Sequence, residues 1–254
     1  MATRRSRTGL TGSRPPRAAA HEAELAAEGE APATVGGRSL RRSTPLLLLE
    51  TMRPKQWIKN LFVFAGLAFA GKVTDPGDIG IAVAVFAAFC MASGATYLLN
   101  DVRDAEADRH NPRTASRPIA RGDLSPRLAL TVAALSAAAA LAIATAVNWQ
   151  ALAVLGGYVL LQLGYSLGLK HVLFVDVMAI SAGFVLRAAA GGLAIDVPIS
   201  SWLLLCTALL AIFLGFTKRR AEAVALGGSS QPRREVLDHY SVELLDELIA
   251  VVTP

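Results

Sequence analysis

Four long segments of the sequence contain no charged residue, and a fifth contains only one. The uncharged segments are residues 79–99, 128–147, 151–169 and 199–216, and the fifth, residues 177–195, contains only Arg187. An α-helix needs about 20 apolar residues to cross the roughly 30 Å hydrocarbon core of a bilayer. One such segment is compatible with a buried helix of a soluble protein, but five in a single chain predict an integral membrane protein.

Two weaker segments extend this pattern. Residues 58–71 are apolar but shorter and include Lys59, and residues 242–254 look like the first turns of another helix. We therefore predict an all-α, polytopic membrane bundle over residues 44–254, with six complete spans and a seventh that is cut short.

Residues 1–43 have a different composition. They are rich in Arg, Ala, Gly, Ser, Thr and Glu and contain no aromatic residue, which predicts a disordered basic tail. No apolar stretch of a signal peptide follows the early arginines, so a cleaved signal is not favoured. Cys90 and Cys206 both lie in apolar segments, where a free cysteine is typical, so we predict neither a disulfide nor a cysteine-bound metal.

The basic residues alternate along the chain in a way that predicts its orientation. Lys and Arg concentrate in the cytoplasmic loops of membrane proteins. The loops at 72–78, 148–150 and 196–198 contain a single basic residue, Lys72, whereas those at 100–127 and 217–241 are rich in arginine. We predict a multi-pass protein of the plasma membrane with the tail and the arginine-rich loops in the cytoplasm. The net charge of +5 follows largely from the tail and this rule, so nucleic-acid binding is not predicted.

Acidic residues gather where the segment 79–99 ends. Asp101, Asp104 and Asp108 have offsets of 0, 3 and 7, so they share one face if the helix continues, and Asn100 borders that face. Three carboxylates repel each other unless a cation lies among them, and oxygen clusters suit Mg²⁺, which usually also binds substrate phosphates. These residues are candidate metal ligands, and the three aspartates are candidate catalytic residues.

Basic and polar side chains on the same predicted membrane face are candidates to bind substrate. The segment after the acidic cluster is rich in Pro and Gly, which predicts a loop, and its arginines suit phosphate oxygens. An ordinary basic cytoplasmic loop and ordinary interfacial anchors are the alternatives. Arg187 differs because a charge inside a span is costly and should face the bundle interior or a polar cavity. The candidates are Lys55, Lys59, Asn100, Arg117, Tyr165, Lys170 and Arg187.

Several segments resemble one known family. Residues 100–108, NDVRDAEAD, resemble the NDxxDxxxD motif of the UbiA-type intramembrane prenyltransferase superfamily, and the flanking GATYLLND and RPIARGDLS resemble its flanks. YSLGLKHV resembles the second motif region. MRPKQWIKN and GFTKRRAE are similar to a branch of the family that transfers phosphoribosyl groups to lipid, and this resemblance extends over residues 45–254.

The resemblance implies a helical bundle around a cavity open to the cytoplasm and to lipid, with Mg²⁺ and diphosphate at the motif regions. It implies that Asn100, Asp101, Asp104 and Asp108 hold Mg²⁺ and diphosphate, and that Tyr165 and Lys170 lie at the second motif. The branch implies transfer of 5-phosphoribose from 5-phosphoribosyl 1-diphosphate to a polyprenyl phosphate such as decaprenyl phosphate, for cell-wall arabinan synthesis. Acceptor chain length and oligomeric state are left open.

The sequence departs from the family pattern in two places. The usual second pair of acids is missing, since only Asp176 lies near Lys170, and the chain stops at Pro254, where relatives continue, so we expect a fragment or a shortened product. Two alternatives remain: a UbiA-type enzyme that prenylates an aromatic acceptor, and a transporter or non-catalytic membrane protein in which Asp176 and Arg187 serve a pathway. No inverted repeat is visible, which disfavours common transporter folds.

Overall fold

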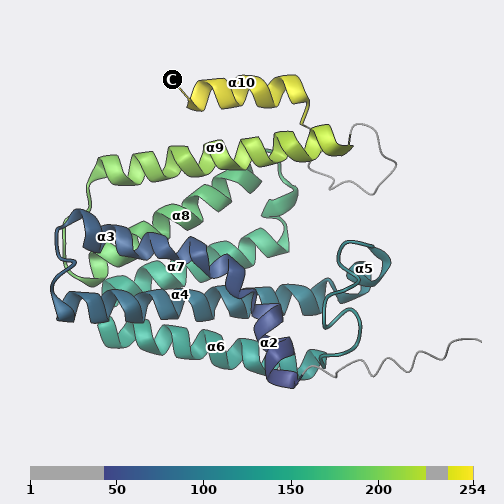
Figure 1. Ribbon diagram of the computed structural model, residues 1–254, viewed down its shortest axis with the longest axis horizontal. Coiled ribbons are helices and arrows are strands. Elements are labelled where there is room, and N and C mark those ends of the chain that lie inside the picture. The colour runs from purple at the N-terminus through teal and green to yellow at the C-terminus, as the bar shows by residue number, and fades with distance from the viewer. Residues whose placement is uncertain (1–42, 227–239, 254) are drawn as a thin grey trace, which may run out of the picture. The chain divides into compact units, whose positions relative to one another are not determined.

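The computed structural model describes residues 43–226 and 240–253, and within them it contains helices and no strand. The predicted tail therefore lies outside the described residues except for Ser43. The elements are α2 Thr44–Met52, η1 Pro54–Val63, α3 Phe64–Phe69, α4 Pro76–Arg103, α5 Ala105–His110, α6 Pro126–Val147, α7 Trp149–Leu167, η2 Leu169–His171, α8 Val175–Ala194, α9 Ser201–Leu226 and α10 Val242–Val252 (Figure 1).

Five of these helices, α4, α6, α7, α8 and α9, are long and apolar enough to cross a membrane. They coincide with the five long apolar segments of the sequence. Their starts are set by local signals: Pro76 and Pro126 occupy first-turn positions, where a missing N–H costs nothing. Asp75 caps α4 by accepting from the N–H groups of Gly77 and Asp78, at 2.7 and 3.1 Å.

Helices α4 and α8 form the centre of the bundle. In each, 56% of the apolar window is buried, against 22% in α6 and α7 and 17% in α9. The main apolar cluster joins Phe89 on α4, Leu155 and Tyr158 on α7 and Ala190 on α8. The outer helices leave apolar side chains such as Leu135 and Leu160 exposed, as expected of a surface that faces lipid chains.

The first predicted span has a different form in the structure. Instead of one helix over residues 58–71, the chain forms the 3-10 helix η1 followed by the short helix α3. Arg53 pairs with Asp101 near the end of α4, at 2.6 Å, and Lys72 pairs with Asp78 near its start, at 3.0 Å. The segment therefore runs antiparallel to α4 along most of its length, although it is not one of the five helices long enough to span.

The 3-10 conformation explains how so few residues cover this distance. A 3-10 helix rises about 2.0 Å per residue and an α-helix about 1.5 Å, so the ten residues of η1 and the six of α3 extend roughly 29 Å. In the sequence, this segment differs from the five long helices in the shorter length of its apolar stretch, residues 58–71.

The last predicted segment is a helix, α10, but it packs along α9 rather than projecting as the start of a seventh span (Figure 1). Its apolar residues Leu245, Leu248 and Ile249 join Val177 and Phe216 in one cluster. The opposite face is acidic and exposed, with Glu243, Asp246 and Glu247. The pattern of α10 is that of an amphipathic helix.

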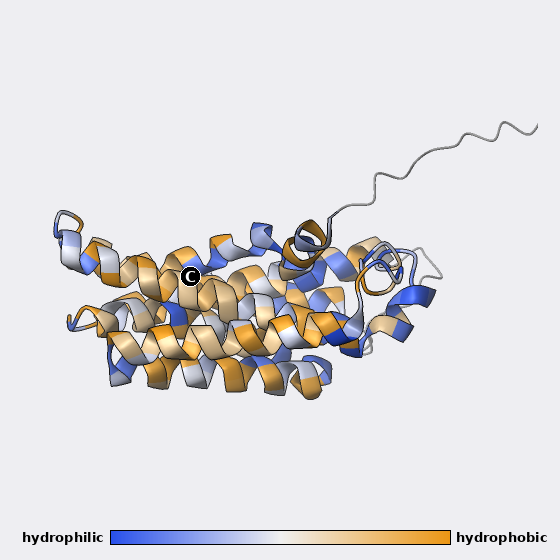
Figure 2. Cartoon of the chain, turned by 90° about the horizontal axis from the view of Figure 1, so that it is seen from below, coloured by the Kyte–Doolittle hydropathy of each residue, from blue (hydrophilic) through white to orange (hydrophobic). Residues whose placement is uncertain are grey.

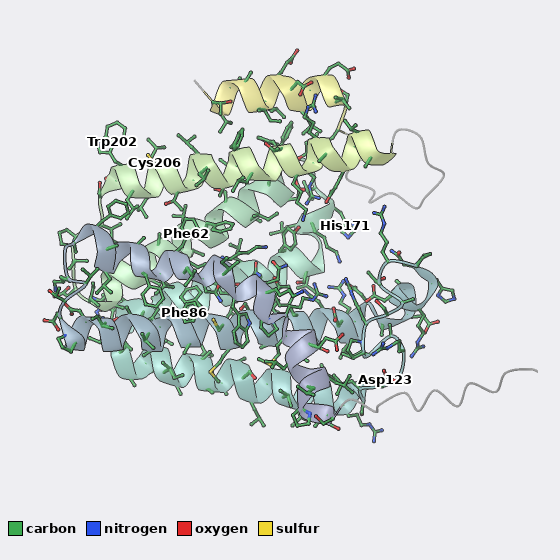
Figure 3. The ribbon with its side chains drawn as sticks, in the orientation of Figure 1. Phe62, Phe86, Asp123, His171, Trp202 and Cys206 are labelled. Atoms are coloured by element: carbon green, nitrogen blue, oxygen red, sulfur yellow. The ribbon has the colours of Figure 1, made fainter. Side chains whose placement is uncertain are left out.

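The two ends of the bundle differ in chemistry. Hydrophilic residues gather at the end that carries α5, whereas the middle of the long helices is mostly hydrophobic (Figure 2). Trp149 and Trp202 begin α7 and α9 at the other end and are 73% and 75% exposed. Tryptophan is enriched at membrane interfaces. Figure 3 shows Trp202 at one end of the bundle and His171 and Asp123 toward the other.

Candidate functional site

The acidic cluster lies at a break between two helices. The shared face was expected if the helix continued past Asn100; α4 ends at Arg103, α5 begins at Ala105, and Asp104 lies between them with φ −90° and ψ 3°. The N–H of Asp104 still donates to the carbonyl of Asn100, and that of Asp108 to Asp104, both at 2.8 Å. The turn thus keeps helical hydrogen bonds across the break, and the carboxylates remain close in space.

Arg117 lies between two of the three carboxylates. Its Nη1 is 2.6 Å from Oδ2 of Asp108 and 3.3 Å from Oδ1 of Asp101. Arg53 Nη2 also donates to Oδ1 of Asp101, at 2.6 Å, and Asp101 is 2% exposed. The predicted proximity of Asp101 and Asp108 is therefore real, and a guanidinium occupies the position between them.

The third carboxylate faces the other motif region. Lys170 Nζ, on η2, is 3.7 Å from Oδ2 of Asp104. Arg103 Nη1 donates to the carbonyl of Ser166 at the end of α7, at 2.8 Å. These two contacts hold the α7–α8 connection against the end of α4, so residues far apart in sequence form one charged site.

Buried apolar side chains fix the loop that carries Arg117. Residues 111–125 form a series of turns, as predicted, and Gly122 takes φ +82°. Ile119 and Leu124 are each 1% exposed and pack in a cluster with Leu98 of α4. These contacts hold the loop against α4 and thereby set the position of Arg117.

Arg53 is a site residue that we did not include among the candidates. It caps α2 in the left-handed region, with φ 56°, a conformation that is costly for a residue with a side chain. Its guanidinium lies 4.7 Å from the centre of the Tyr97 ring as well as against Asp101. The sequence signal was present, since Arg53 precedes Pro54 at the mouth of the first apolar segment.

Arg187 is buried among helices instead of lining the charged cluster. Its Nε donates to Oδ1 of Asn60 at 2.7 Å, Nη1 to the carbonyl of Gly183 at 2.7 Å, and Nη2 to the hydroxyl of Tyr158 at 2.8 Å. Asn60 also donates to Cys90 at 3.2 Å. The arginine faces the bundle interior, as predicted, and connects η1, α7 and α8.

The remaining candidates are more peripheral. Lys55 and Lys59 are exposed on η1, and Lys59 lies within electrostatic range of Arg187 and Lys218. Tyr165, near the end of α7, is partly buried and lies within electrostatic range of Arg219. Asn100 is partly buried beside Asp101.

Comparison with known proteins identifies the family. Residues 60–221 match the UbiA prenyltransferase family. The chain belongs to this family. It is also 40% identical over 202 residues to the decaprenyl-phosphate phosphoribosyltransferase of Mycolicibacterium smegmatis, and 39% identical over 199 residues to that of Corynebacterium glutamicum. These matches cover 78% and 76% of this chain but only 64% and 60% of the relatives.

Solved structures show the same fold. A UbiA homologue from Archaeoglobus fulgidus, bound to GPP and Mg²⁺, superposes with a TM-score of 0.67 at 20% identity, over 81% of this chain and 75% of that one. The all-helical bundle of this chain is therefore a UbiA fold.

Carboxylate oxygens are the ligand type that hard cations prefer, but in this structure Arg53, Arg117 and Lys170 pair with them. In residues 43–226 and 240–253, no three His, Cys, Asp or Glu side chains are grouped so as to hold a metal ion. Each of the three carboxylates forms an ion pair: Asp101 with Arg53, Asp108 with Arg117 and Asp104 with Lys170. Each carboxylate has further lone pairs, so oxygen ligands remain for a cation that arrives with an anionic substrate.

Proposed function

We propose that this protein transfers 5-phosphoribose from 5-phosphoribosyl 1-diphosphate to a polyprenyl phosphate, with decaprenyl phosphate as the model acceptor, and releases diphosphate. The observation that carries the proposal is the charge arrangement at the end of α4. Asp101, Asp104 and Asp108 alternate with Arg117 and Lys170 within ion-pair distance. A metal-bound diphosphate has both signs of charge and matches such a site. The relatives named decaprenyl-phosphate phosphoribosyltransferase support the choice of substrates.

The chain's residues have separate tasks in this reaction. Asn100, Asp101, Asp104 and Asp108 are the ligands we assign to Mg²⁺, which when bound neutralises charge on the departing diphosphate. Arg117 and Lys170 exchange their carboxylate partners for phosphate oxygens of the donor. Lys55, Lys59 and Tyr165, on the same face of the membrane, are the further groups available to the ribose 5-phosphate and the acceptor phosphate.

The bond changes need no strong general base. An oxygen of the ionised acceptor phosphate forms a bond to the anomeric carbon, and the bond from that carbon to diphosphate breaks, with the electron pair leaving on diphosphate. The donor is soluble in water and the acceptor has a lipid tail, so they meet at the membrane surface. We assign this surface to the cytoplasmic face of the plasma membrane, and the product to cell-wall arabinan synthesis.

Competing labels test the proposal directly. Membranes containing the protein are incubated with Mg²⁺ and either labelled phosphoribosyl diphosphate plus polyprenyl phosphate, or labelled prenyl diphosphate plus an aromatic acceptor. We expect label from phosphoribosyl diphosphate in the lipid extract. Label from prenyl diphosphate in an aromatic product would replace our proposal with the other UbiA reaction.

Asp104→Asn tests the acidic cluster. The change keeps the shape of the side chain but removes a charge that faces Lys170, so we expect transfer to fall about 100-fold or more and to require more Mg²⁺. The measurement is the initial rate over a Mg²⁺ titration.

Asp123→Asn is the matched control for this test. Asp123 lies in the turns between α5 and α6, pairs with Arg121 at 2.7 Å, and its side chain is 49% exposed. We expect a change smaller than about twofold, because an exposed ion pair contributes little. Normal transfer by folded Asp104→Asn would show that this carboxylate is not needed for the reaction and would contradict the role we assign to the acidic cluster.

A further inference from the structure

The connection between α7 and α8 contains a strained turn at Phe174. This residue has φ 64° and ψ −37°, and the N–H of Val175 donates to the carbonyl of Leu173 at 2.8 Å. The pair defines a γ-turn with positive φ, which is rare and costly for a bulky residue. Such a backbone persists only where the surroundings hold it.

Tyr240, just before α10, contacts this turn directly. Its hydroxyl accepts from the N–H of Phe174 at 2.9 Å and donates to Oδ1 of Asp176 at 3.0 Å. Its ring packs edge-on against the Phe174 ring, with centroids 5.9 Å apart. One side chain thus holds the backbone on one side of the turn and the first residues of α8 on the other.

The Asp176 carboxylate, which accepts the hydrogen bond from Tyr240, is itself held in place. Asp176 is fully buried, and its Oδ2 accepts from Nε of Arg219 on α9 at 2.8 Å. Arg219 is 2% exposed and also pairs with Glu222 at 2.6 Å. Burial, together with the neighbouring Asp176 carboxylate, raises the pKa of Tyr240 to about 12, so the hydroxyl keeps its proton and donates.

The same connection carries Lys170. This residue lies four positions before Phe174, and its ammonium group faces Asp104. The connection is therefore fastened near its start, by Arg103 to the carbonyl of Ser166, and at its end, by Tyr240. The described contacts of Tyr240 include none with the acidic cluster, so any effect on that cluster passes through the connection.

We propose that Tyr240 is a positioning residue that locks the Phe174 turn and thereby holds Lys170 against Asp104, where the donor diphosphate binds. Its kinetic consequence depends on the proposed phosphoribosyl transfer, whereas its structural consequence does not. The hydrogen-bond chain from Phe174 through Tyr240 to Asp176 and Arg219 links the second motif region to α9 and α10.

The kinetic test is Tyr240→Phe, which removes only the hydroxyl. We expect KM for phosphoribosyl diphosphate to rise about threefold to tenfold, as for one lost buried hydrogen bond, and KM for polyprenyl phosphate to change less than about twofold. In a Lys170→Met background, Tyr240→Phe should have no further effect on donor KM. An equal effect in both backgrounds would overturn the proposed route through Lys170.

Ser241→Ala is the matched control. Ser241 caps α10, since its Oγ accepts from the N–H of Leu244 at 3.0 Å, and it is adjacent to Tyr240 in sequence. The variant loosens the start of α10 while the Tyr240 hydroxyl stays in place, so donor KM should not change. A rise equal to that of Tyr240→Phe would show that general loosening of α10 is the cause and would overturn the proposal.

A second readout is independent of activity. In purified protein, acetic anhydride labelling followed by mass spectrometry compares Lys170 with the exposed Lys55. We expect Tyr240→Phe to increase the relative labelling rate of Lys170 severalfold, and Asp176→Asn, which leaves Arg219 paired with Glu222, to act in the same direction. If the wild-type protein transfers no phosphoribose, this labelling still tests whether Tyr240 positions Lys170. Unchanged Lys170 labelling in both folded variants would overturn the positioning role.

Discussion

Individual arginines in this chain perform two different tasks. Arg117 and Arg53 neutralise carboxylates at the membrane surface, whereas Arg187 is buried and bonded to neutral groups. Its guanidinium also lies 4.6 Å from the centre of the Tyr158 ring. A buried cation with this set of partners is suited to fixing helices relative to each other.

Arg187→Met tests this task. The variant leaves Oδ1 of Asn60 and the hydroxyl of Tyr158 without their donor, at a cost of roughly 1–3 kcal/mol for each group. We expect a lower Tm in detergent, with donor KM of the folded fraction unchanged.

Arg121→Met is the control for this substitution, because the Arg121 side chain is 41% exposed and pairs at the surface with Asp123. We expect its Tm to match wild type. A higher donor KM in Arg187→Met at unchanged Tm would instead assign Arg187 to substrate binding, as we first predicted from the sequence.

The residue patterns predicted some contacts and not others. The spacing of Asp101 and Asp108 predicted their proximity, because a helical repeat is a local property. The pairing of Arg53 with Asp101 joins residues 48 positions apart, and no periodicity encodes it. Asp176 looked like a lone acid, but its partners Arg219 and Tyr240 come from other elements.

At the scale of elements, the 3-10 segment and α3 depend on glycines in α8. A Cβ added to Gly191 would lie 1.7 Å from the carbonyl oxygen of Val63, and one added to Gly66 would lie 2.5 Å from the N of Gly192. Small residues allow such close backbone approach between membrane helices. The first apolar segment therefore packs on a glycine surface of α8.

Gly191→Ala is expected to separate these elements. The added methyl group cannot fit without moving backbone, so we expect a loss of roughly 1–3 kcal/mol in stability. The measurement is Tm together with the monodisperse fraction after detergent extraction.

Gly157→Ala on α7 is the matched control. A Cβ there meets nothing within 4 Å. Because alanine is about 0.5–1 kcal/mol better than glycine inside a helix, we expect equal or higher stability. A Tm of Gly191→Ala as high as this control would contradict the close packing of α3 on α8.

At the scale of the whole chain, the distribution of charge predicts orientation. The loop of Asp123 and the η2 region lie at one end of the long helices, and residues 70–75 and 195–200 lie at the other. The first end carries most of the arginines and the second carries Trp149 and Trp202. We therefore expect the first end to face the cytoplasm.

Single cysteines test this orientation. In a background with Cys90 and Cys206 replaced by alanine, we expect an impermeant maleimide to label Thr74→Cys in intact cells and Asp123→Cys only after permeabilisation. Both sites are exposed, so access to the reagent is decided by the membrane. The reverse pattern would place the acidic cluster outside the cell and contradict the proposed use of a cytoplasmic donor.

The sequence by itself determined the five membrane-length helices, the turns after α5 and the family motif, because these depend on composition and spacing over short stretches. The tertiary structure decided what the charges do. It paired Asp104 with Lys170, inserted Arg117 between Asp101 and Asp108, and converted a predicted span into a 3-10 helix beside α4. Ion pairs and close backbone contacts join distant segments, so their energies appear only once the helices have packed.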